Sequence, residues 1–148
     1  MASLRQFLKE KGYHSIKLTE THTGHFKINL KLNGVIGSFI LDTGASNTCV
    51  DFKAADQFKL FAEDSDVKAA GAGAVDMFTQ ISSNNTVAIE NWSIADVDVV
   101  LFDLSHVNTA LTDHDILGVD GIIGADILNQ AKAVIDYEYH CLYLKDRQ

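Results

Sequence analysis

Residues 26–32 carry the clearest pattern of hydrophobic and polar positions in the chain, because apolar and polar side chains alternate there. A repeat of two residues predicts a strand that buries one of its faces. The pair Asn33-Gly34 follows at once, and both residue types tolerate a positive φ, which predicts a tight hairpin. The returning segment, residues 35–41, is almost wholly apolar. We therefore expect a central strand, covered on both faces, that leads directly to Asp42.

The rest of the chain shows shorter patterns, some with the two-residue period of a strand and others with the longer period of a helix. Short helices are expected at residues 4–11, 51–60 and 125–131, the first two capped by Ser3 and Asp51. Further strands are expected at residues 75–81, 86–89, 92–102 (with a bulge near Ala95), 121–124, 134–137 and 141–144. The polar stretches expected to be loops are residues 63–66 and residues 103–120, the second being a long surface loop with local order. These elements predict one mainly β domain over residues 1–148.

Charge is distributed unevenly along the 148 residues. The net charge is −8, yet residues 1–31 hold six Lys or Arg against two Glu, which is +4, and the remainder is −12. Nucleic acids and anionic membranes are bound through clusters of Lys and Arg. No apolar run reaches the roughly 18 residues that a membrane span requires. We therefore expect neither a nucleic acid nor a membrane as a partner.

The two cysteines, Cys49 and Cys141, both lie among apolar neighbours. Two buried thiols in a reducing compartment are expected, and a single disulfide is the open alternative. The first residues lack the continuous apolar core of a secretory signal. A cytoplasmic location is the expectation that follows.

The tripeptide Asp42-Thr43-Gly44 is the strongest candidate for chemistry in the chain. A carboxylate at the end of a buried strand costs free energy unless it is hydrogen-bonded or functional. Gly44 can take a tight turn that aims backbone N–H groups at the carboxylate, and Thr43 adds a hydroxyl. The alternative is a structural Asp that only starts a turn.

A second element, far downstream, is Gly121-Ile122-Ile123-Gly124, which precedes a predicted short helix. Two apolar residues between glycines fit a short strand that passes another strand at close range. Together with the tripeptide at Asp42, this motif resembles the retropepsin-like aspartic proteases, over residues 25–144. The resemblance implies an all-β, retropepsin-like acid-protease fold, that is, a closed, barrel-like β domain with short helices. Residues 1–24 are an N-terminal extension, containing a short helix, outside the family pattern.

The resemblance also implies roles for individual residues. Asp42 is implied as the catalytic carboxylate, Thr43 as the residue whose hydroxyl bonds across to a partner loop, and Gly44 as a backbone donor to the carboxylate. The arm that supports this loop is implied at Gly121, Ile122, Ile123 and Gly124. The flap over the substrate is implied at Gly71, Ala72 and Gly73. Neither a metal nor a cofactor is implied.

This chemistry requires two carboxylates that share one proton. The chain has one Asp-Thr-Gly and no Asp-Ser-Gly, so we expect a homodimer that brings two copies of Asp42 together. The predicted function is an aspartic endopeptidase that hydrolyses a peptide or protein substrate with a water activated by the two Asp42 carboxylates. The alternative is a dimerisation or peptide-binding module of the same fold, with weak or absent hydrolysis.

Overall fold

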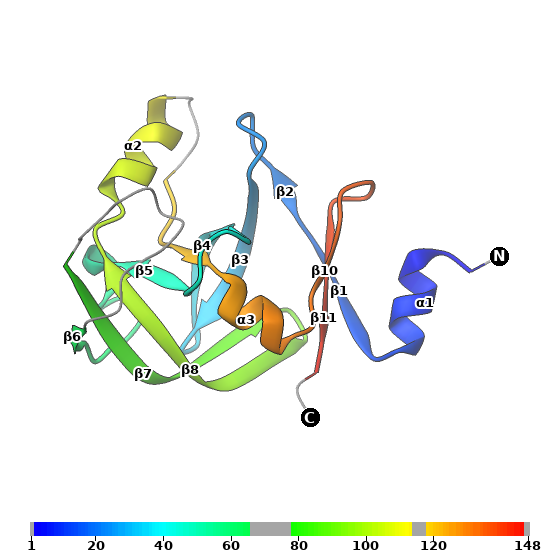
Figure 1. Ribbon diagram of the computed structural model, residues 1–148, viewed down its shortest axis with the longest axis horizontal. Helices are drawn as coiled ribbons and strands as arrows, with labels where there is room; N and C mark the ends of the chain where they lie inside the picture. The colour runs from blue at the N-terminus through cyan, green and yellow to red at the C-terminus, as the bar shows by residue number, and fades with distance from the viewer. Residues whose placement is uncertain (1, 66–77, 114–117, 147–148) are drawn as a thin grey trace.

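Six strands close into a barrel in the structure, a computed structural model that describes residues 2–65, 78–113 and 118–146 (Figure 1). The barrel strands, in order of neighbours, are β3 (Phe26–Leu32), β4 (Val35–Leu41), β9 (Gly121–Ile123), β5 (Cys49–Asp51), β8 (Trp92–Phe102) and β7 (Thr79–Ile89). Pairing of β7 with β3 closes the ring. Two short strands, β2 (Thr19–Glu20) and β6 (Glu63–Ser65), extend the sheet beside β3 and β7.

A smaller sheet lies beside the barrel (Figure 1). Its strands, in order, are β1 (Tyr13–Lys17), β11 (Cys141–Lys145) and β10 (Val134–Asp136). The helices are α1 (Leu4–Glu10), α2 (Ser105–Asp113) and α3 (Ala125–Gln130). Figure 1 shows α1 and α2 at opposite ends of the molecule. Within the described ranges, no helix is both long enough and apolar enough to cross a bilayer.

The β3–β4 hairpin forms where the alternating pattern and the Asn33-Gly34 pair predict it. Asn33 and Gly34 have φ values of 53° and 82°. Asn33 also ties the turn to distant segments: its Nδ2 donates to the Phe58 carbonyl at 2.8 Å, and its Oδ1 accepts from the Thr86 N–H at 3.0 Å. The turn residue thus joins the hairpin to β7, where the barrel closes.

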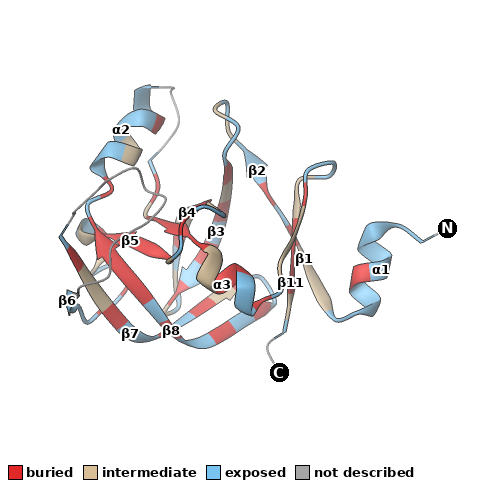
Figure 2. Ribbon diagram, viewed as in Figure 1, coloured by how far each residue is buried: buried red, intermediate tan, exposed pale blue. Residues whose placement is uncertain are grey.

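The end of β4 separates two hydrophobic clusters. Phe39 and Leu41 belong to the main cluster, which includes the fully buried Trp92. Ile40 belongs to a second cluster, whose members are Ile40, Ala45, Cys49, Val100, Phe102, Leu104, Leu111, Val119 and Ile122. Buried residues line the strands in Figure 2. The end of β4 is therefore covered on both faces, as predicted, whereas Ile36 near its start is 62% exposed.

Residues 103–120, predicted to be a long surface loop with local order, contain the helix α2, which the prediction did not name. The Asp103 carboxylate accepts a hydrogen bond from the Ser105 N–H at 2.8 Å, at the start of the helix. Val107 and Leu111, four residues apart, pack into the second hydrophobic cluster. Because the helix has so few apolar residues, its helical pattern in the sequence is weak. The side chains that bury Val107 and Leu111 belong to distant strands.

The helix predicted at residues 51–60 is also wrong. Only a 3₁₀ turn, Phe52–Ala54, follows Asp51, and Lys59 has a φ of 58°, which an α-helix does not allow. The predicted cap is confirmed, because the Asp51 carboxylate accepts a backbone N–H of this turn at 3.2 Å. The strand β6 lies where a loop was predicted at residues 63–66.

The two strands predicted on either side of residues 82–85 are one strand, β7, as far as the structure describes them. Asn85 is buried, and its amide donates to backbone carbonyls of β7 and β8 at 2.9 and 3.2 Å. These bonds hold an irregular stretch inside the ladder. The bulge predicted near Ala95 is confirmed by the φ of 57° at Asp96 and by a shift in the β7–β8 register.

The strand β1 lies within the predicted N-terminal extension and was not foreseen. Ile16 of β1 is opposite Leu142 of β11, and both are buried. The helix α1 precedes it, and the Ser3 hydroxyl caps this helix by accepting the Gln6 N–H at 3.1 Å. Backbone pairing of β1 therefore ties the N-terminal segment to the C-terminal strand.

Candidate functional site

Asp42 is the first residue after β4, beside the parallel strand β9. Leu41 pairs with Ile123, and the Asp42 N–H donates to the Ile123 carbonyl at 3.0 Å. The backbone position of Asp42 is therefore set by a strand from the other end of the sequence.

The turn after Asp42 orients its side chain. The Gly44 N–H donates to Asp42 Oδ1 at 2.9 Å, and the Ala45 N–H donates to the Asp42 carbonyl at 3.2 Å. Asp42 is half-buried, whereas Thr43 and Gly44 are exposed. A carboxylate oriented by a backbone donor is thus presented at the surface, next to an exposed hydroxyl.

The strand β9 passes between β4 and β5, parallel to the first and antiparallel to the second. A Cβ at Gly121 would overlap the Cys49 carbonyl oxygen and lie 2.6 Å from the Phe39 ring. A Cβ at Gly124 would lie 2.7 Å from the Asn47 carbonyl oxygen. Only glycine lets the three segments approach this closely.

Asp126 in the first turn of α3 holds the far end of the loop that begins at Asp42. The Thr48 hydroxyl donates to Asp126 Oδ1 at 2.8 Å, and the Thr48 N–H donates to Asp126 Oδ2 at 3.0 Å. The Gly124 N–H donates to the Thr48 hydroxyl at 3.0 Å, and the Ala125 N–H donates to the Ala45 carbonyl at 2.8 Å. The start of α3 is therefore bonded to this loop at several points.

Cys49 is buried directly behind the loop. Burial, followed by the negative charges of Asp126 and Asp42, raises the pKa of its thiol to about 12. Its Sγ donates to the Asn47 carbonyl at 3.1 Å. The thiol is consequently protonated at neutral pH and is unsuited to act as a nucleophile.

A pocket of about 270 Å³ opens beside Asp42. Its lining residues come from β4, β9, α2 and the β2–β3 turn: His25, Ile40, Asp42, His106, Val107, Ala110, Leu111 and Ile122. Among these described residues, Asp42 is the single carboxylate. The pocket thus joins one acidic group to a mainly aliphatic lining.

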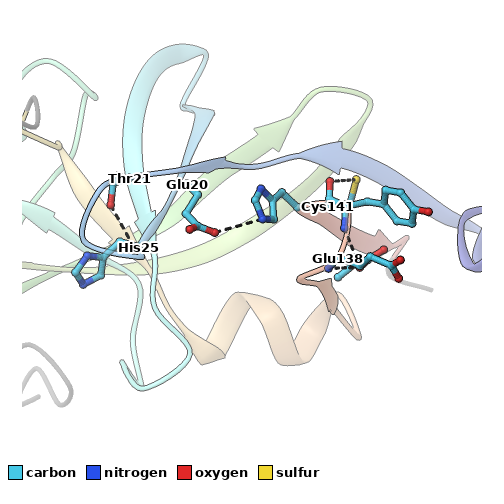
Figure 3. Close-up of polar contacts among 8 residues, drawn as sticks. Glu20, Thr21, His25, Glu138 and Cys141 are labelled. Carbon is cyan, nitrogen blue, oxygen red and sulfur yellow. Dashed lines mark hydrogen bonds and ion pairs between the residues drawn. The ribbon is translucent and has the colours of Figure 1, made fainter.

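His25 reaches this pocket from the turn between β2 and β3. Its Nδ1 lies 2.6 Å from the Thr23 hydroxyl, and its backbone N–H donates to the Thr21 hydroxyl at 3.2 Å. In Figure 3 the His25 ring projects on the opposite side of the turn from Glu20, whose carboxylate is 3.3 Å from His140. The contact between Glu20 and His140 therefore lies at the C-terminal hairpin, whereas His25 lines the pocket.

The structure places Asp42, Thr43 and Gly44 against residues 121–124, the two motifs singled out in the sequence. The proposed flap residues, Gly71, Ala72 and Gly73, lie outside the described residues. Within the part that is described, no three His, Cys, Asp or Glu side chains converge as a metal site.

Sequence reasoning did not single out Asp126 or the pocket histidines as site residues. The sequence held one signal for Asp126, which is its position in the first turn of a short helix. The residue before α3 is glycine and has no side chain to cap the helix, so an Asp in the first turn is noteworthy. No local pattern marks His25 or His106, because the pocket forms only when distant segments meet.

Comparison with known proteins identifies relatives of this arrangement. The model of a family described as aspartyl protease matches residues 28–127. No curated protein matches the chain. A retropepsin-like aspartic protease from Rickettsia conorii is 18% identical, with a TM-score of 0.58 and 89% of each chain covered.

Two further solved structures are similar at 18% identity. The retroviral protease-like domain of Ddi1 from Leishmania major has a TM-score of 0.52, with 80% of this chain and 86% of that chain covered. EIAV protease, in complex with the inhibitor HBY-793, has a TM-score of 0.53, with 80% of this chain and 98% of that chain covered. The predicted all-β, retropepsin-like fold is thereby confirmed.

Proposed function

The chain belongs to the aspartyl protease family, and from that premise we propose that it is an endopeptidase whose active site forms between two copies of the chain. The observation that carries this proposal is the placement of Asp42 in an exposed turn, with Gly44 donating to its carboxylate at 2.9 Å. The carboxylate also lines a pocket, so it can meet a substrate.

The chemistry requires a second carboxylate close to the first. One carboxylate takes a proton from the attacking water while the other donates a proton to the carbonyl oxygen, and one proton is shared between them. No other acidic residue lines the described pocket at Asp42. A second copy of the chain, related by a two-fold axis, supplies the missing group most simply.

The surface beside the loop suits such a pairing. An open depression of about 470 Å³ begins at the exposed Thr43 and continues along α3 and the small sheet. Its apolar lining residues are Ala125, Leu128, Ala133 and Ile135. We place the subunit contact here, with Thr43 bonding across the axis.

The remaining features of the proposal come from the sequence and from its resemblance to the family. The flap is proposed at Gly71, Ala72 and Gly73, the support at residues 121–124, and a single domain over residues 1–148 with 1–24 as its N-terminal extension. Peptide or protein substrates, a cytoplasmic location and the lack of a need for metal or cofactor belong to the same proposal.

Cleavage of a protein substrate tests this function. Wild-type protein and Asp42→Asn are incubated with an unfolded protein at several pH values from acid to neutral, and the products are identified by mass spectrometry. The substitution keeps the shape of the side chain and removes its acid–base capacity. Internal cleavage by the wild type alone supports the endopeptidase. Binding of peptides without cleavage by a folded, dimeric wild type would instead support the peptide-binding module.

A further inference from the structure

The strand β1 forms one edge of the small sheet, and among the described residues it pairs with β11 alone. The N–H of Leu18, the residue after β1, donates to the His140 carbonyl at 2.8 Å, in the register of the β1–β11 ladder. Backbone groups of successive residues in an antiparallel pair face the partner strand and the free side in turn. The N–H and C=O groups of Tyr13, Ser15 and Lys17 therefore point away from β11, toward the free side of β1.

Two cavities lie along this free side of β1. The first, of about 320 Å³, is lined by four consecutive residues, 13–16, and the second, of about 520 Å³, is lined by Ile16 and Lys17. Because the side chains of consecutive strand residues point to opposite faces, a cavity that touches four in a row lies against the edge of the strand. The two cavities share Ile16 and Glu90, so they adjoin. Together they are called the edge groove below.

The edge groove runs into the place where β1 and β3 separate. Thr19 of β2 pairs with Lys27 of β3, whereas β1 pairs with no described residue of β3. Farther along, β3 pairs with β7 at Lys31 and Leu32. Asn29 lies between these two pairings and lines the second cavity. The groove thus occupies a fork between strands, where a further strand can lie beside β1.

The edge groove has an excess of basic side chains, although the whole chain has a net charge of −8. The lining Lys and Arg residues are Arg5 and Lys9 in the first cavity and Lys17 and Lys27 in the second. Among the described lining residues, Glu90 is the single carboxylate. An acidic strand is therefore attracted to this edge, whereas a second copy of the same edge would bring further basic side chains to it.

We propose that the free edge of β1 binds an extended, acidic peptide segment of a partner protein, which adds a strand to the small sheet. The segment bonds to the outward N–H and C=O groups of Tyr13, Ser15 and Lys17, and its carboxylates lie beside the basic side chains of the groove. The surface proposed above for the subunit contact is lined by β10, at the opposite edge of the small sheet. The edge of β1 is therefore free in that dimer, and the inference does not depend on hydrolysis.

Binding of synthetic peptides tests the edge groove. The probe is a ten-residue peptide in which Glu alternates with Val or Thr, two residues that favour an extended chain. A second peptide has Lys in place of every Glu. Both are titrated by calorimetry into full-length Asp42→Asn protein, so that cleavage cannot consume them. Amide hydrogen exchange of the same protein is followed residue by residue by NMR, with and without the acidic peptide.

Two pairs of variants in the same background locate the binding. Ser15→Pro removes an N–H that points outward, and it leaves the bonds between β1 and β11 in place because proline is tolerated on an edge strand. Ser15→Ala is its matched control, since it loses the hydroxyl as the proline variant does but keeps the N–H. Lys17→Glu reverses a charge in the groove, and Lys53→Glu makes the same change at an exposed lysine that lines neither cavity.

The acidic peptide is expected to slow amide exchange at Ser15 and Lys17 by about 10-fold or more, and to change Ile16 less, because the Ile16 N–H already faces β11. Ser15→Pro should weaken binding of the acidic peptide by about 10-fold, and Ser15→Ala by less than about 2-fold. Lys17→Glu should weaken it by about 5-fold, and Lys53→Glu by less than about 2-fold. The Lys peptide should bind at least about 10-fold more weakly than the acidic one.

The contrary results are equally specific. Failure of the acidic peptide to bind, or equal binding of the two peptides, overturns the proposal. Binding that leaves exchange at Ser15 and Lys17 unchanged, or that Lys17→Glu and Lys53→Glu weaken equally, places the peptide elsewhere and also overturns it. Dissociation of a dimer by Ser15→Pro without added peptide, seen by analytical ultracentrifugation, would show that a second copy occupies the edge. If circular dichroism shows that Ser15→Pro does not fold, the exchange data and the two lysine variants decide the matter.

Discussion

The Thr48 hydroxyl donates a hydrogen bond to the Asp126 carboxylate at 2.8 Å, although the two residues are far apart in the sequence. Thr48 is only 2% exposed, and its N–H donates to the other oxygen of the same carboxylate at 3.0 Å. The pair joins the start of α3 to the loop that begins at Asp42. Two predictions about the loop follow from this attachment and from the glycine beside it.

Asp126→Ala is expected to destabilise the protein by about 2–3 kcal/mol, because it leaves two buried donors of Thr48 without their acceptor. Urea unfolding measures the change, with Asp56→Ala as the control at an exposed carboxylate. Thr48→Ser keeps the hydroxyl and should cost less than Thr48→Val, which removes it. Equal losses for Ser and Val, or a loss for Asp126→Ala no larger than the control, would show that the pair does not hold the loop.

Gly124→Ala is expected to destabilise the protein by more than about 3 kcal/mol, since the new Cβ would lie 2.7 Å from the backbone oxygen of Asn47. Gly34→Ala provides the comparison, because its Cβ meets nothing within 4 Å and only the φ of +82° is unfavourable. That substitution should cost about 1 kcal/mol. Thermal or urea unfolding of both variants decides the matter, and a similar cost at the two positions would contradict the tight crossing of β9.

The stability of the fold is expected to fall with rising pH above about 9, because of Cys49. Burial raises the pKa of its thiol from the ordinary 9.0 to about 12. Between these two values the unfolded chain loses the thiol proton while the folded chain keeps it. The unfolding free energy should therefore drop by up to about 1.4 kcal/mol per pH unit in that window, with no effect of this thiol at lower pH.

Urea unfolding of the wild type and Cys49→Ala, measured across pH 8–11 or so, isolates this contribution. The alanine variant starts from a lower stability, because the core loses volume, but its curve should be flatter in alkali. A parallel decline of the two proteins would mean that other groups, and not Cys49, set the alkaline limit.

The parts of the site that could be predicted from the sequence depend on local signals. The alternation before Asn33 and the turn chemistry of Asn33-Gly34 define the hairpin. That hairpin delivers Asp42 to the end of a buried strand. The spacing of Gly121 and Gly124 marks a segment that must pass its neighbours closely, which the structure shows in the crossing of β9.

The remaining parts of the site depend on contacts between residues that are far apart in the sequence. Thr48 and Asp126 carry no joint signal in the sequence, because each is an ordinary polar residue until α3 packs against the loop. The helix α2 has few apolar residues, and its burial depends on partners such as Ile40 and Ile122 in distant strands. His25 becomes a pocket residue for the same reason. Local periodicity cannot report contacts of this kind.

The central claim is that two copies of Asp42 form one active site, and mixing of chains tests it most directly. Wild-type and Asp42→Asn chains are denatured together, refolded in varying proportions and assayed at constant total protein, with exchange of chains confirmed by mass spectrometry of the intact dimers. Only dimers of two wild-type chains hold both carboxylates, so activity is predicted to follow the square of the wild-type fraction and to fall to roughly a quarter in an equal mixture. A linear decline, with about half of the activity kept in the equal mixture, would contradict the shared site and would require a second acid within one chain.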